Sequence, residues 1–449
     1  MEKLFGTDGI RGVANRELTP EMTLRIGRII ASMLGRSESR PVILIGRDTR
    51  ISGAMLEGSL SAGITSAGAA VRLLGIAPTP AVAYLIRSLK ATAGIVISAS
   101  HNPIEDNGLK IFDRDGLKLP DEMEKEIERI YFQYEKYESM LLHPEGTEVG
   151  AVMHDGEALE SYLQYLKKAA PSLEGLHLVV DCGHGAACRL ARELLQQMGA
   201  DVELLHGVAD GGLINVNCGA TDTTELQREV VRCGADAGLA FDGDADRLIA
   251  VDEKGAVIDG DAIMSICAIA MAGQGRLNKN TLVATVMSNG GLDLLAEEYG
   301  FKLRRTSVGD RYVLEEMLTG GYNLGGEQSG HIIFSDHATT GDGLLAALQL
   351  MAIVRDAGRP LSELAGRLKR LPQVLYNQPV ILQKGWEDNP AINSAIEDLR
   401  GRLGRHSRVL VRPSGTEPLI RIMLEAPLPE DKLWKEARDL AEIIVREKG

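Results

Sequence analysis

Cysteine is scarce in this sequence and shows no clustering. Only five cysteines occur among 449 residues, and no two of them form a CxxC pair. They are Cys182, Cys188, Cys218, Cys233 and Cys267. An odd number of scattered thiols argues against a disulfide framework and against a structural zinc site. We therefore expect reduced and mostly buried thiols, as in a cytoplasmic protein.

The sequence also lacks an excess of positive charge and any long apolar run. Lys and Arg total 49 against 63 Asp and Glu, which gives a net charge of -14 and a pI near 5.3. A nucleic-acid partner or an anionic membrane partner is therefore not expected, and an anionic small ligand would need local arginines. The longest apolar stretch, residues 262–273, is too short to span a bilayer, and the first twelve residues have no signal-peptide core.

What the sequence does contain is an alternation of short apolar runs and helical segments. A length of 449 residues suits two to four domains. The alternation predicts α/β domains with mostly parallel, buried strands. The C-terminal part, with strand-like runs at 409–415 and 419–426 before a final helix, predicts a smaller α+β domain. The acidic stretch 121–140 is expected to be a helix whose charges form a solvated face.

A faint internal repeat relates two of these runs. Residues 91–100 (ATAGIVISAS) align with residues 235–244 (ADAGLAFDGD), which places Ser100 opposite Asp244. Each has Ala-x-Ala-Gly, an apolar strand segment and then a small polar loop. Three related α/β units, each offering one loop, fit this pattern, although a pairing this short also arises by chance.

The loop SASHNP places polar side chains at the end of an apolar strand. Ser98, Ser100 and His101 stand there, and ligands of parallel α/β sheets bind at that edge. A serine in this place is a candidate nucleophile, but the loop is not a G-x-S-x-G elbow, and a capped polar turn is the alternative. Lys110 follows on the next short strand, where a buried lysine near other cations loses its proton easily and serves as a base.

The stretch FDGDADRL, residues 241–248, carries three alternating aspartates. Asp242, Asp244 and Asp246 can each turn a carboxylate toward a hard cation, and Arg247 can pair with phosphoryl oxygens. An EF-hand is disfavoured, although Glu253 stands at its twelfth position, because Arg247 occupies the place of the required glycine and the flanks are strand-like. A purely structural acidic turn is the remaining alternative.

Two further loops suit a phosphorylated sugar. In GGEQSGH, Glu327 and Ser329 offer an acceptor and a donor for sugar hydroxyls. A plain glycine-rich turn is an equally good interpretation of this motif. In VRPSGTEPLIR, backbone N–H groups and hydroxyls can form a nest for a phosphate monoester between two arginines. Its candidate residues are Arg412, Ser414, Gly415, Thr416 and Arg421.

The residues that follow the run LVVDC resemble a dinucleotide-binding signature. Gly183 and Gly185 precede a helix, and Glu203 follows about twenty residues later, which would suit an NAD-dependent oxidoreductase. However, the third glycine position holds Cys188, and Glu203 lies inside a strand. We therefore interpret both glycines as tight-turn residues.

Taken together, the motifs GTDGIRG, SASHNP, DGDADR, GEQSGH and RPSGTEP resemble the α-D-phosphohexomutase superfamily in order and over the whole chain. The resemblance implies a four-domain architecture around a central cleft. Three related α/β domains (1–150, 151–252 and 253–368) would carry the serine, metal and sugar loops. A C-terminal α+β domain (369–449) would carry the phosphate loop.

The resemblance also implies a role for each motif residue. Ser100 would be carried as phosphoserine and would hold Mg²⁺ together with Asp242, Asp244 and Asp246. The reaction centre would contain Arg11, His101, Lys110, Arg247 and His331, with Lys110 and His331 as the acid/base pair. Glu327 and Ser329 would hold the sugar, and the fourth loop would grip the phosphate that does not react. A sugar 1,6-bisphosphate would be the activator, and a homodimer is possible.

The substrate expected from the resemblance is glucosamine 6-phosphate, converted to glucosamine 1-phosphate for cell-wall precursor synthesis. The GTDGIRG opening and Gln328 favour this amino sugar. Ala245 points the other way, because the amino-sugar enzymes usually have glycine there and the mannose and glucose enzymes commonly have alanine. Mannose or glucose phosphates therefore stay open as alternative substrates.

Overall fold

The computed structural model describes residues 3–6, 8–34, 41–380, 385–413 and 419–448. These residues divide into two compact units. One unit comprises Met1–Val286 with Arg304–Ala365, and the other comprises Met287–Leu303 with Gly366–Gly449. The two units are described separately below.

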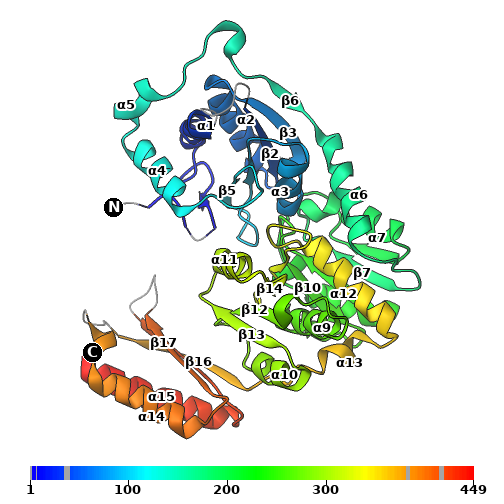
Figure 1. Cartoon of the computed structure of the whole chain (residues 1–449), viewed down its shortest axis with the longest axis vertical. Helices are drawn as coiled ribbons and strands as arrows, with labels where there is room; N and C mark the ends of the chain where they lie inside the picture. The colour runs from blue at the N-terminus through cyan, green and yellow to red at the C-terminus, as the bar shows by residue number, and fades with distance from the viewer. Residues whose placement is uncertain (1–2, 7, 35–40, 381–384, 414–418, 449) are drawn as a thin grey trace. The chain divides into compact units, whose positions relative to one another are not determined.

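The first domain contains a six-stranded sheet in the order β1-β5-β4-β2-β3-β6 (Figure 1). Its strands are β1 (Ile10–Val13), β2 (Val42–Arg47), β3 (Ala70–Ile76), β4 (Ala93–Ile97), β5 (Asp106–Phe112) and β6 (Val152–His154). Its helices are α1 (Pro20–Leu34), α2 (Ser52–Ser66), α3 (Thr79–Ser88), α4 (Asp121–Phe132) and α5 (Tyr134–Tyr137). Glycine lets α1 and α2 pack closely, since a Cβ at Gly63 would come within 2.0 Å of the Leu24 carbonyl oxygen.

The second and third sheets have the orders β11-β10-β9-β7-β8 and β13-β12-β14-β15. The second-domain elements are α6 (Leu159–Ala169), β7 (His177–Asp181), α7 (Ala191–Gln197), β8 (Asp201–Leu205), α8 (Thr224–Cys233), β9 (Ala237–Phe241), β10 (Leu248–Asp252) and β11 (Val257–Ile258). After these come α9 (Gly260–Gly273), β12 (Thr281–Thr285), α10 (Gly291–Tyr299), β13 (Lys302–Thr306), α11 (Asp310–Gly320), β14 (Leu324–Gly326), β15 (Ile332–Phe334), α12 (Gly343–Ala357) and α13 (Leu361–Ala365).

The last sheet is antiparallel, with the order β16-β18-β17. Its elements are β16 (Gln373–Pro379), α14 (Pro390–Leu403), β17 (Arg408–Pro413), β18 (Leu419–Glu425) and α15 (Glu430–Lys448). Figure 1 shows α14 and α15 side by side along this sheet, where they share one apolar core with its strands. Three α/β domains followed by a smaller α+β domain confirm the fold class predicted from the sequence.

The same hairpin recurs in the three α/β sheets. A buried strand that is parallel to one neighbour (β4, β9 or β14) turns back into an antiparallel partner (β5, β10 or β15). The loops between the paired strands, residues 98–105, 242–247 and 327–331, contain the candidate chemistry. The sheets are therefore mixed, whereas the sequence predicted mostly parallel strands, because hydrophobic alternation does not reveal strand direction.

The charged helix α4 agrees only in part with expectation, because Asp121, Glu122 and Lys125 are exposed but other charges of the helix are bonded to the protein. Its acidic face was predicted to be solvated, but Glu128 accepts a hydrogen bond from the backbone N–H of Phe5 at 2.8 Å. Asp121 and Glu124 form ion pairs with Arg311 of α11. The face therefore connects the first domain to the third, a use that a charge pattern alone does not reveal. Within the described ranges, every helix is too short or too polar to cross a bilayer.

Candidate active site

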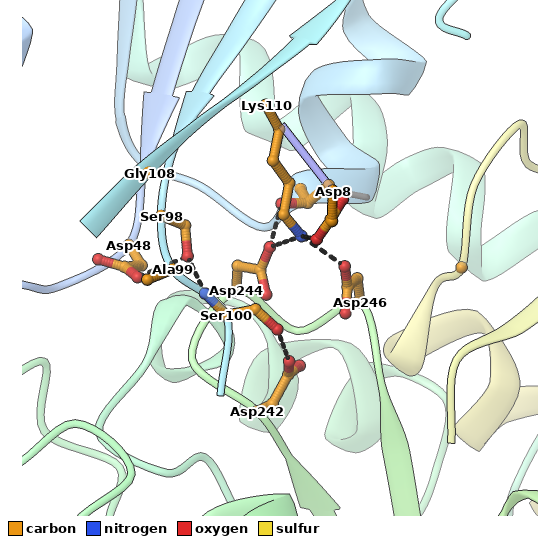
Figure 2. A network of polar contacts seen from close by, with 12 residues as sticks. Asp8, Asp48, Ser98, Ala99, Ser100, Gly108, Lys110, Asp242, Asp244 and Asp246 are labelled. Atoms are coloured by element: carbon orange, nitrogen blue, oxygen red, sulfur yellow. Dashed lines mark hydrogen bonds and ion pairs between the residues drawn. The ribbon is translucent and has the colours of Figure 1, made fainter. Parts of the chain in front are cut away.

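The serine loop and the aspartate loop meet at Ser100. Its Oγ donates a hydrogen bond to Oδ2 of Asp242 at 2.6 Å (Figure 2). Both side chains are buried. Nδ1 of His101 lies 3.2 Å from the same Oγ, and burial, followed by Arg247 and Arg11, lowers the His101 pKa to about 4. The nucleophile predicted from the sequence is thus in direct contact with the predicted cation site.

The backbone of Ser100 adopts an unusual conformation. Its φ is 55°, in the left-handed region that side chains other than glycine disfavour. The Ser98 hydroxyl accepts a hydrogen bond from the Ser100 N–H at 2.8 Å and donates one to Oδ2 of Asp48 at 2.6 Å. Such a conformation persists where the surrounding contacts enforce it, and it occurs often at reactive residues.

A buried arginine holds the other side of the same loop. The Arg50 side chain is fully buried, and its Nε donates to Oδ2 of Asp48 at 3.0 Å. Its Nη2 donates to the carbonyl oxygens of Ser100 at 3.0 Å and of Asn102 at 2.8 Å. We call Asp48, Arg50 and Ser98 the loop clamp. Burial raises the pKa of Asp48 to about 6, although Arg50 and the Ser98 hydroxyl oppose the shift.

Sequence analysis did not select Asp48 or Arg50. Both follow β2, which pairs in parallel with β4, the strand that leads to Ser100. The carboxyl ends of adjacent parallel strands meet at one sheet edge. The available signal was therefore an aspartate and an arginine placed directly after a neighbouring buried strand.

The three aspartates of the second loop form a compact acidic group. Asp242, Asp244 and Asp246 are buried, and each offers an oxygen within 4.8 Å of the others. Oδ1 of Asp244 and Oδ1 of Asp246 make no hydrogen bond among the described residues. Burial, followed by repulsion from the other two carboxylates, raises the pKa of Asp242 to about 8. Buried carboxylate oxygens that make no hydrogen bond fit a hard metal ion, which this group could bind.

The aspartate loop does not have the geometry of an EF-hand. It is a hairpin loop between β9 and β10, not a link between helices. Glu253, at the twelfth position, accepts hydrogen bonds from the backbone and hydroxyl of Ser362. Glu253 is therefore bonded to Ser362 and does not take the place of the bidentate cation ligand of an EF-hand.

Lys110 has different neighbours from those expected. The sequence interpretation required nearby cations, but Nζ lies 2.7 Å from Oδ2 of both Asp244 and Asp246 and 3.3 Å from Oδ2 of Asp8 (Figure 2). Burial lowers the lysine pKa, but the three carboxylates outweigh burial and hold it well above its usual value. The expectation of easy proton loss was therefore wrong, because carboxylates rather than cations surround the ammonium group.

A chain of ion pairs continues from this lysine site to the third domain. Lys118 binds both Asp8 and Asp310. Oδ2 of Asp310 lies 3.4 Å from Nε2 of His331, whose Nδ1 lies 3.6 Å from Oδ1 of Asp246. Burial lowers the His331 pKa, but these two carboxylates raise it overall. Sequence analysis missed Asp8, Lys118 and Asp310, and only Asp8, inside GTDGIRG, belonged to a recognised motif.

A cavity of ≈ 530 Å³ opens beside these groups. It brings together predicted site residues from the N-terminal motif and all three hairpin loops, namely Arg11, His101, Asp246, Arg247, Glu327 and His331. Nη1 of Arg11 donates to the Asn102 amide oxygen at 3.1 Å, and Nε of Arg247 lies 3.9 Å from Oδ1 of Asp246. Two arginines in a partly closed cavity suit an anionic ligand.

The third loop contributes only partly to this cavity. Oε1 of Glu327 accepts a hydrogen bond from the Gly309 N–H at 3.0 Å, and its residue lines the cavity. Ser329 is exposed and is not among the lining residues. The Gln328 amide donates to Oδ2 of Asp259, the N-cap of α9, at 3.1 Å. Gln328 therefore supports the loop in this structure.

The fourth loop lies partly outside the described residues. This applies to Ser414, Gly415 and Thr416. Arg412 and Arg421 face each other as a register pair of β17 and β18, with Arg412 exposed and Arg421 half-buried. The two arginines thus stand on adjacent strands at the base of the predicted phosphate loop.

The glycines of the dinucleotide-like motif have a packing role. A Cβ at Gly185 would come within 2.5 Å of the Gly243 carbonyl oxygen, and that oxygen accepts a hydrogen bond from the Ala186 N–H at 2.8 Å. Gly183 has a φ of 55°. These glycines let the turn after β7 pack against the aspartate loop, as the tight-turn interpretation expected.

Comparison with known proteins covers nearly the whole chain. Four family models of phosphoglucomutase/phosphomannomutase match it in order. They are the α/β/α domain I (residues 2–138), domain II (160–255), domain III (259–371) and the C-terminal domain (375–443).

Individual proteins agree with these matches. The chain is 52% identical to a phosphoglucosamine mutase of Thermoanaerobacter sp. over 99% of both chains, and 51% identical to that of Geobacillus kaustophilus over 100% of both. A phosphoglucomutase/phosphomannomutase family protein from Burkholderia thailandensis has a similar structure, with TM-score 0.84 and 22% identity over 100% of this chain and 99% of that one. The N-acetylphosphoglucosamine mutase of Aspergillus fumigatus, in complex with GlcNAc-6P and magnesium, has TM-score 0.69 and 17% identity over 100% and 96%.

Proposed function

Because the chain belongs to the phosphoglucomutase/phosphomannomutase family, we propose that it acts as a phosphoglucosamine mutase and interconverts glucosamine 6-phosphate and glucosamine 1-phosphate. The observation that carries this proposal is the contact between the Ser100 hydroxyl and Asp242 of the cation-binding group. This contact places a nucleophile next to a site that can bind the cation of a phosphate group.

The reaction we propose uses Ser100 as a phosphoryl carrier. The phosphoryl group on Oγ passes to the C1 oxygen of glucosamine 6-phosphate, that hydroxyl loses its proton, and a 1,6-bisphosphate and free serine result. The bisphosphate then reverses its orientation in the cavity. Its 6-phosphoryl group returns to Oγ, the O6 oxygen regains a proton, and glucosamine 1-phosphate leaves.

The aspartate loop would bind Mg²⁺ together with the phosphate on Ser100. Oxygen-only donors with open positions suit this ion, which neutralises charge on a phosphoryl group in transfer. When ionised, the three buried carboxylates outnumber the two cations paired with them, Lys110 and Arg247, and so leave net negative charge to offset a dication. Arg247, 3.9 Å from Asp246, would hold the phosphoryl oxygens.

Lys110 and His331 are the proposed acid and base. Both are buried and contact the aspartate loop from opposite domains, Lys110 on β5 and His331 beside β15. His101 touches Ser100 Oγ and Arg11 lines the same cavity, so both would contact the reacting phosphate. Proton transfer of this kind needs side chains within hydrogen-bond reach of the sugar oxygen.

Recognition of the remaining parts of the substrate is proposed for the third and fourth loops. Glu327 and Ser329 would hold sugar hydroxyls. The phosphate that does not react would lie on Arg412, Ser414, Gly415, Thr416 and Arg421. The crystallised fungal relative with a bound phosphosugar and magnesium supports a ligand of this class. The activator would be glucosamine or glucose 1,6-bisphosphate.

The remaining expectations extend this proposal beyond the site. Domain boundaries at 1–150, 151–252, 253–368 and 369–449 are supported by the segments that the four family models match. We propose a cytoplasmic enzyme that can form a homodimer, and we expect neither nucleic acid nor membrane as a partner.

A mannose or glucose phosphate is the second candidate substrate. The observation that favours it concerns Gln328, whose amide N–H binds Asp259 and which is not among the residues that line the cavity. Discrimination within this loop would then depend on Glu327 and Ser329. The expected result for the amino sugar is a preference in kcat/KM of about 100-fold or more, roughly 2.7 kcal/mol of transition-state discrimination.

The test compares kcat/KM for glucosamine 6-phosphate, mannose 1-phosphate and glucose 1-phosphate, each with Mg²⁺ and the matching 1,6-bisphosphate. Equal or faster turnover of the neutral hexoses would move the assignment to a broad phosphohexomutase. Ser100→Ala should abolish turnover of all three while the circular dichroism spectrum is kept. Ser265→Ala, which removes a buried hydroxyl bonded to the Ala262 carbonyl within α9, is the matched control and should stay active.

A further inference from the structure

Two turns of the second domain that carry three of the five cysteines pack against each other, since a Cβ at Gly219 would come within 3.0 Å of the Cα of Gly183. Cys182 precedes Gly183 and Cys218 precedes Gly219. Cys188 Sγ donates to the backbone carbonyl oxygen of His206 at 3.4 Å. The thiols lie in the turn after β7 and in the loop between β8 and α8, so spacing along the chain does not reveal their proximity.

An imidazole and a carboxylate complete the cluster. Nδ1 of His206 lies 3.0 Å from Oδ1 of Asp181. Asp181, His206 and Cys218 each offer one donor atom, and these three atoms lie within 4.8 Å of one another. We propose that Asp181, His206 and Cys218, with Cys188, whose Sγ contacts the His206 backbone, as a fourth donor, form a second cation site, selective for a thiophilic divalent ion such as Zn²⁺. We call these four residues the thiol site.

The donor set separates this site from the aspartate loop. Sulfur and imidazole donors select zinc-like ions, whereas the all-oxygen group of Asp242, Asp244 and Asp246 suits magnesium. Bond lengths of about 2.0–2.3 Å around a tetrahedral ion put its donors about 3.3–3.8 Å apart. The donor atoms of Asp181, His206 and Cys218, which lie within 4.8 Å of one another, therefore need to approach by at most about 1–1.5 Å to hold an ion.

The surroundings of the cluster support ligand geometry. Both Asp181 oxygens accept backbone N–H groups, those of Gly183 and Gly219 at 2.9 Å each, which fixes the carboxylate. Nε2 of His206 faces Oε2 of Glu225 at 3.4 Å, so its other ring nitrogen is the one directed at the cluster. A carboxylate commonly binds the other ring nitrogen of a metal-binding histidine and fixes the orientation of its ring.

The site is closed on one side and open on the other. Asp181 and Cys218 are fully buried, while the His206 side chain is 19% exposed and that of Glu225 is 60% exposed. An ion can therefore reach the donors past His206 without unfolding of the domain. An entry path of this kind is one of the requirements for a metal site.

An ion at the thiol site would join two segments that support the aspartate loop. A Cβ at Gly219 would come within 2.5 Å of the Phe241 carbonyl oxygen, directly before Asp242. In the β8–α8 loop, the Asn215 amide donates to the Ser100 carbonyl oxygen at 2.8 Å. The thiol site thus lies behind the reaction centre, but binding there does not depend on the proposed mutase activity.

The test is a titration of the reduced, metal-free full-length protein with Co²⁺, a spectroscopic substitute for Zn²⁺. The expected result is one equivalent that gives tetrahedral visible bands and a thiolate-to-cobalt charge-transfer band, both removed by added Zn²⁺. Co²⁺ held only by aspartate oxygens would give neither the thiolate band nor strong tetrahedral bands. A titration of the wild type without these bands would overturn the proposal.

Variants assign the bands to the proposed donors. Cys218→Ser and His206→Ala should each remove them, and His206→Ala is the milder change because this side chain is partly exposed. Cys267→Ser, which replaces an equally buried thiol on α9, and Asp244→Asn, in the aspartate loop, should retain them. Bands that survive His206→Ala, or that disappear equally in Cys267→Ser, would contradict the assignment.

Discussion

The Ser98 hydroxyl links Ser100 to Asp48: it accepts the Ser100 backbone N–H at 2.8 Å and donates to the Asp48 carboxylate at 2.6 Å. Both polar functions of this hydroxyl are therefore occupied, and it is not available as a nucleophile. Ser98 instead links the backbone of Ser100 to a buried carboxylate and thereby fixes the position of that backbone. Arg50 does the same from the carbonyl side, so the loop clamp determines where the Ser100 hydroxyl points.

Arg50→Lys should slow catalysis without weakening substrate binding. A lysine keeps the charge next to Asp48 but lacks the planar fork that reaches the carbonyl oxygens of Ser100 and Asn102 together. A displaced nucleophile costs about 100-fold in rate for an error near 1 Å. We expect kcat to fall by that order while KM stays close to the wild-type value, measured by steady-state kinetics.

Arg47→Lys is the matched control for this change. Arg47 forms an ion pair with Glu57, and its Nη1 donates to the backbone carbonyl oxygen of Asp48 at 3.4 Å, but the interactions described for its side chain include none with residues 98–105. This variant should retain kcat. If Arg50→Lys lowered only the melting temperature and left kcat unchanged, the clamp would have a purely structural role.

Removal of the metal should abolish activity, and Asp244→Asn should weaken metal binding. Asp244 is buried, and its Oδ1 makes no hydrogen bond among the described residues. Loss of this carboxylate charge removes one proposed donor. We expect a loss of about 100-fold or more in kcat/KM at limiting Mg²⁺, with partial recovery at high Mg²⁺. The measurement is a Mg²⁺ titration of activity after chelation with EDTA.

Asp252→Asn provides the comparison for the metal prediction. Asp252 is also buried, at the far end of β10, where it accepts backbone N–H groups of Lys254 and Ala256. Its substitution should leave the Mg²⁺ dependence of the activity unchanged. A wild-type enzyme that stays fully active in excess EDTA would refute the metal requirement itself.

Much of the fold was predictable from local patterns. The repeat between residues 91–100 and 235–244 matches β4 and β9, because each is a buried strand that ends in a polar hairpin loop. Ser100 and Asp242 could be selected in this way, since dense polar residues after an apolar strand are a strong signal. The direction of the return strands was not predictable, because it depends on pairing partners.

The remaining features depend on contacts between distant segments. Arg50 has no motif of its own, and its role follows from five bonds that only the folded chain forms. Lys110 was assigned cationic neighbours, whereas the hairpin loop of another domain supplies carboxylates. The nearness of Asp181 and Cys218 likewise depends on the packing of two turns. Sequence spacing measures none of these distances.

Ala245→Gly should stabilise the protein. Ala245 is fully buried with a φ of 57°, a left-handed conformation in which a side chain costs about 1–2 kcal/mol. The greater freedom of glycine in the unfolded chain offsets part of this gain, so we expect a net stabilisation of about 0.5–1 kcal/mol. Calorimetry should show a higher melting temperature.

Ala240→Gly serves as the opposite control for this substitution. Ala240 is equally buried but lies in β9, and its φ is not positive. Glycine there should lower the melting temperature, because it loses packing and adds unfolded-state entropy. Destabilisation by both substitutions would show that the backbone at Ala245 carries no strain.

The pH dependence of stability should contain a contribution from Asp342. Its Oδ1 accepts the Leu345 N–H at the start of α12, and its Oδ2 accepts the Tyr162 hydroxyl at 2.7 Å. Burial outweighs both hydrogen bonds and raises the Asp342 pKa to about 6 from its ordinary value of 3.8. The folded state therefore binds this proton more tightly than the unfolded state. The stabilisation is complete below about pH 4 and is lost as the pH rises through about 6.

Asp342→Asn isolates this contribution, because asparagine keeps the helix cap but cannot ionise. Relative to the variant, the wild type should lose stability between about pH 4 and pH 6, by an amount on the order of 3 kcal/mol at most. Asp48, whose pKa is also raised to about 6, titrates in both proteins and cancels in the difference. The measurement is the difference in melting temperature across this range. Parallel curves would mean that Asp342 keeps its ordinary pKa in the folded protein, and that its hydrogen bonds to Leu345 and Tyr162 compensate fully for its burial.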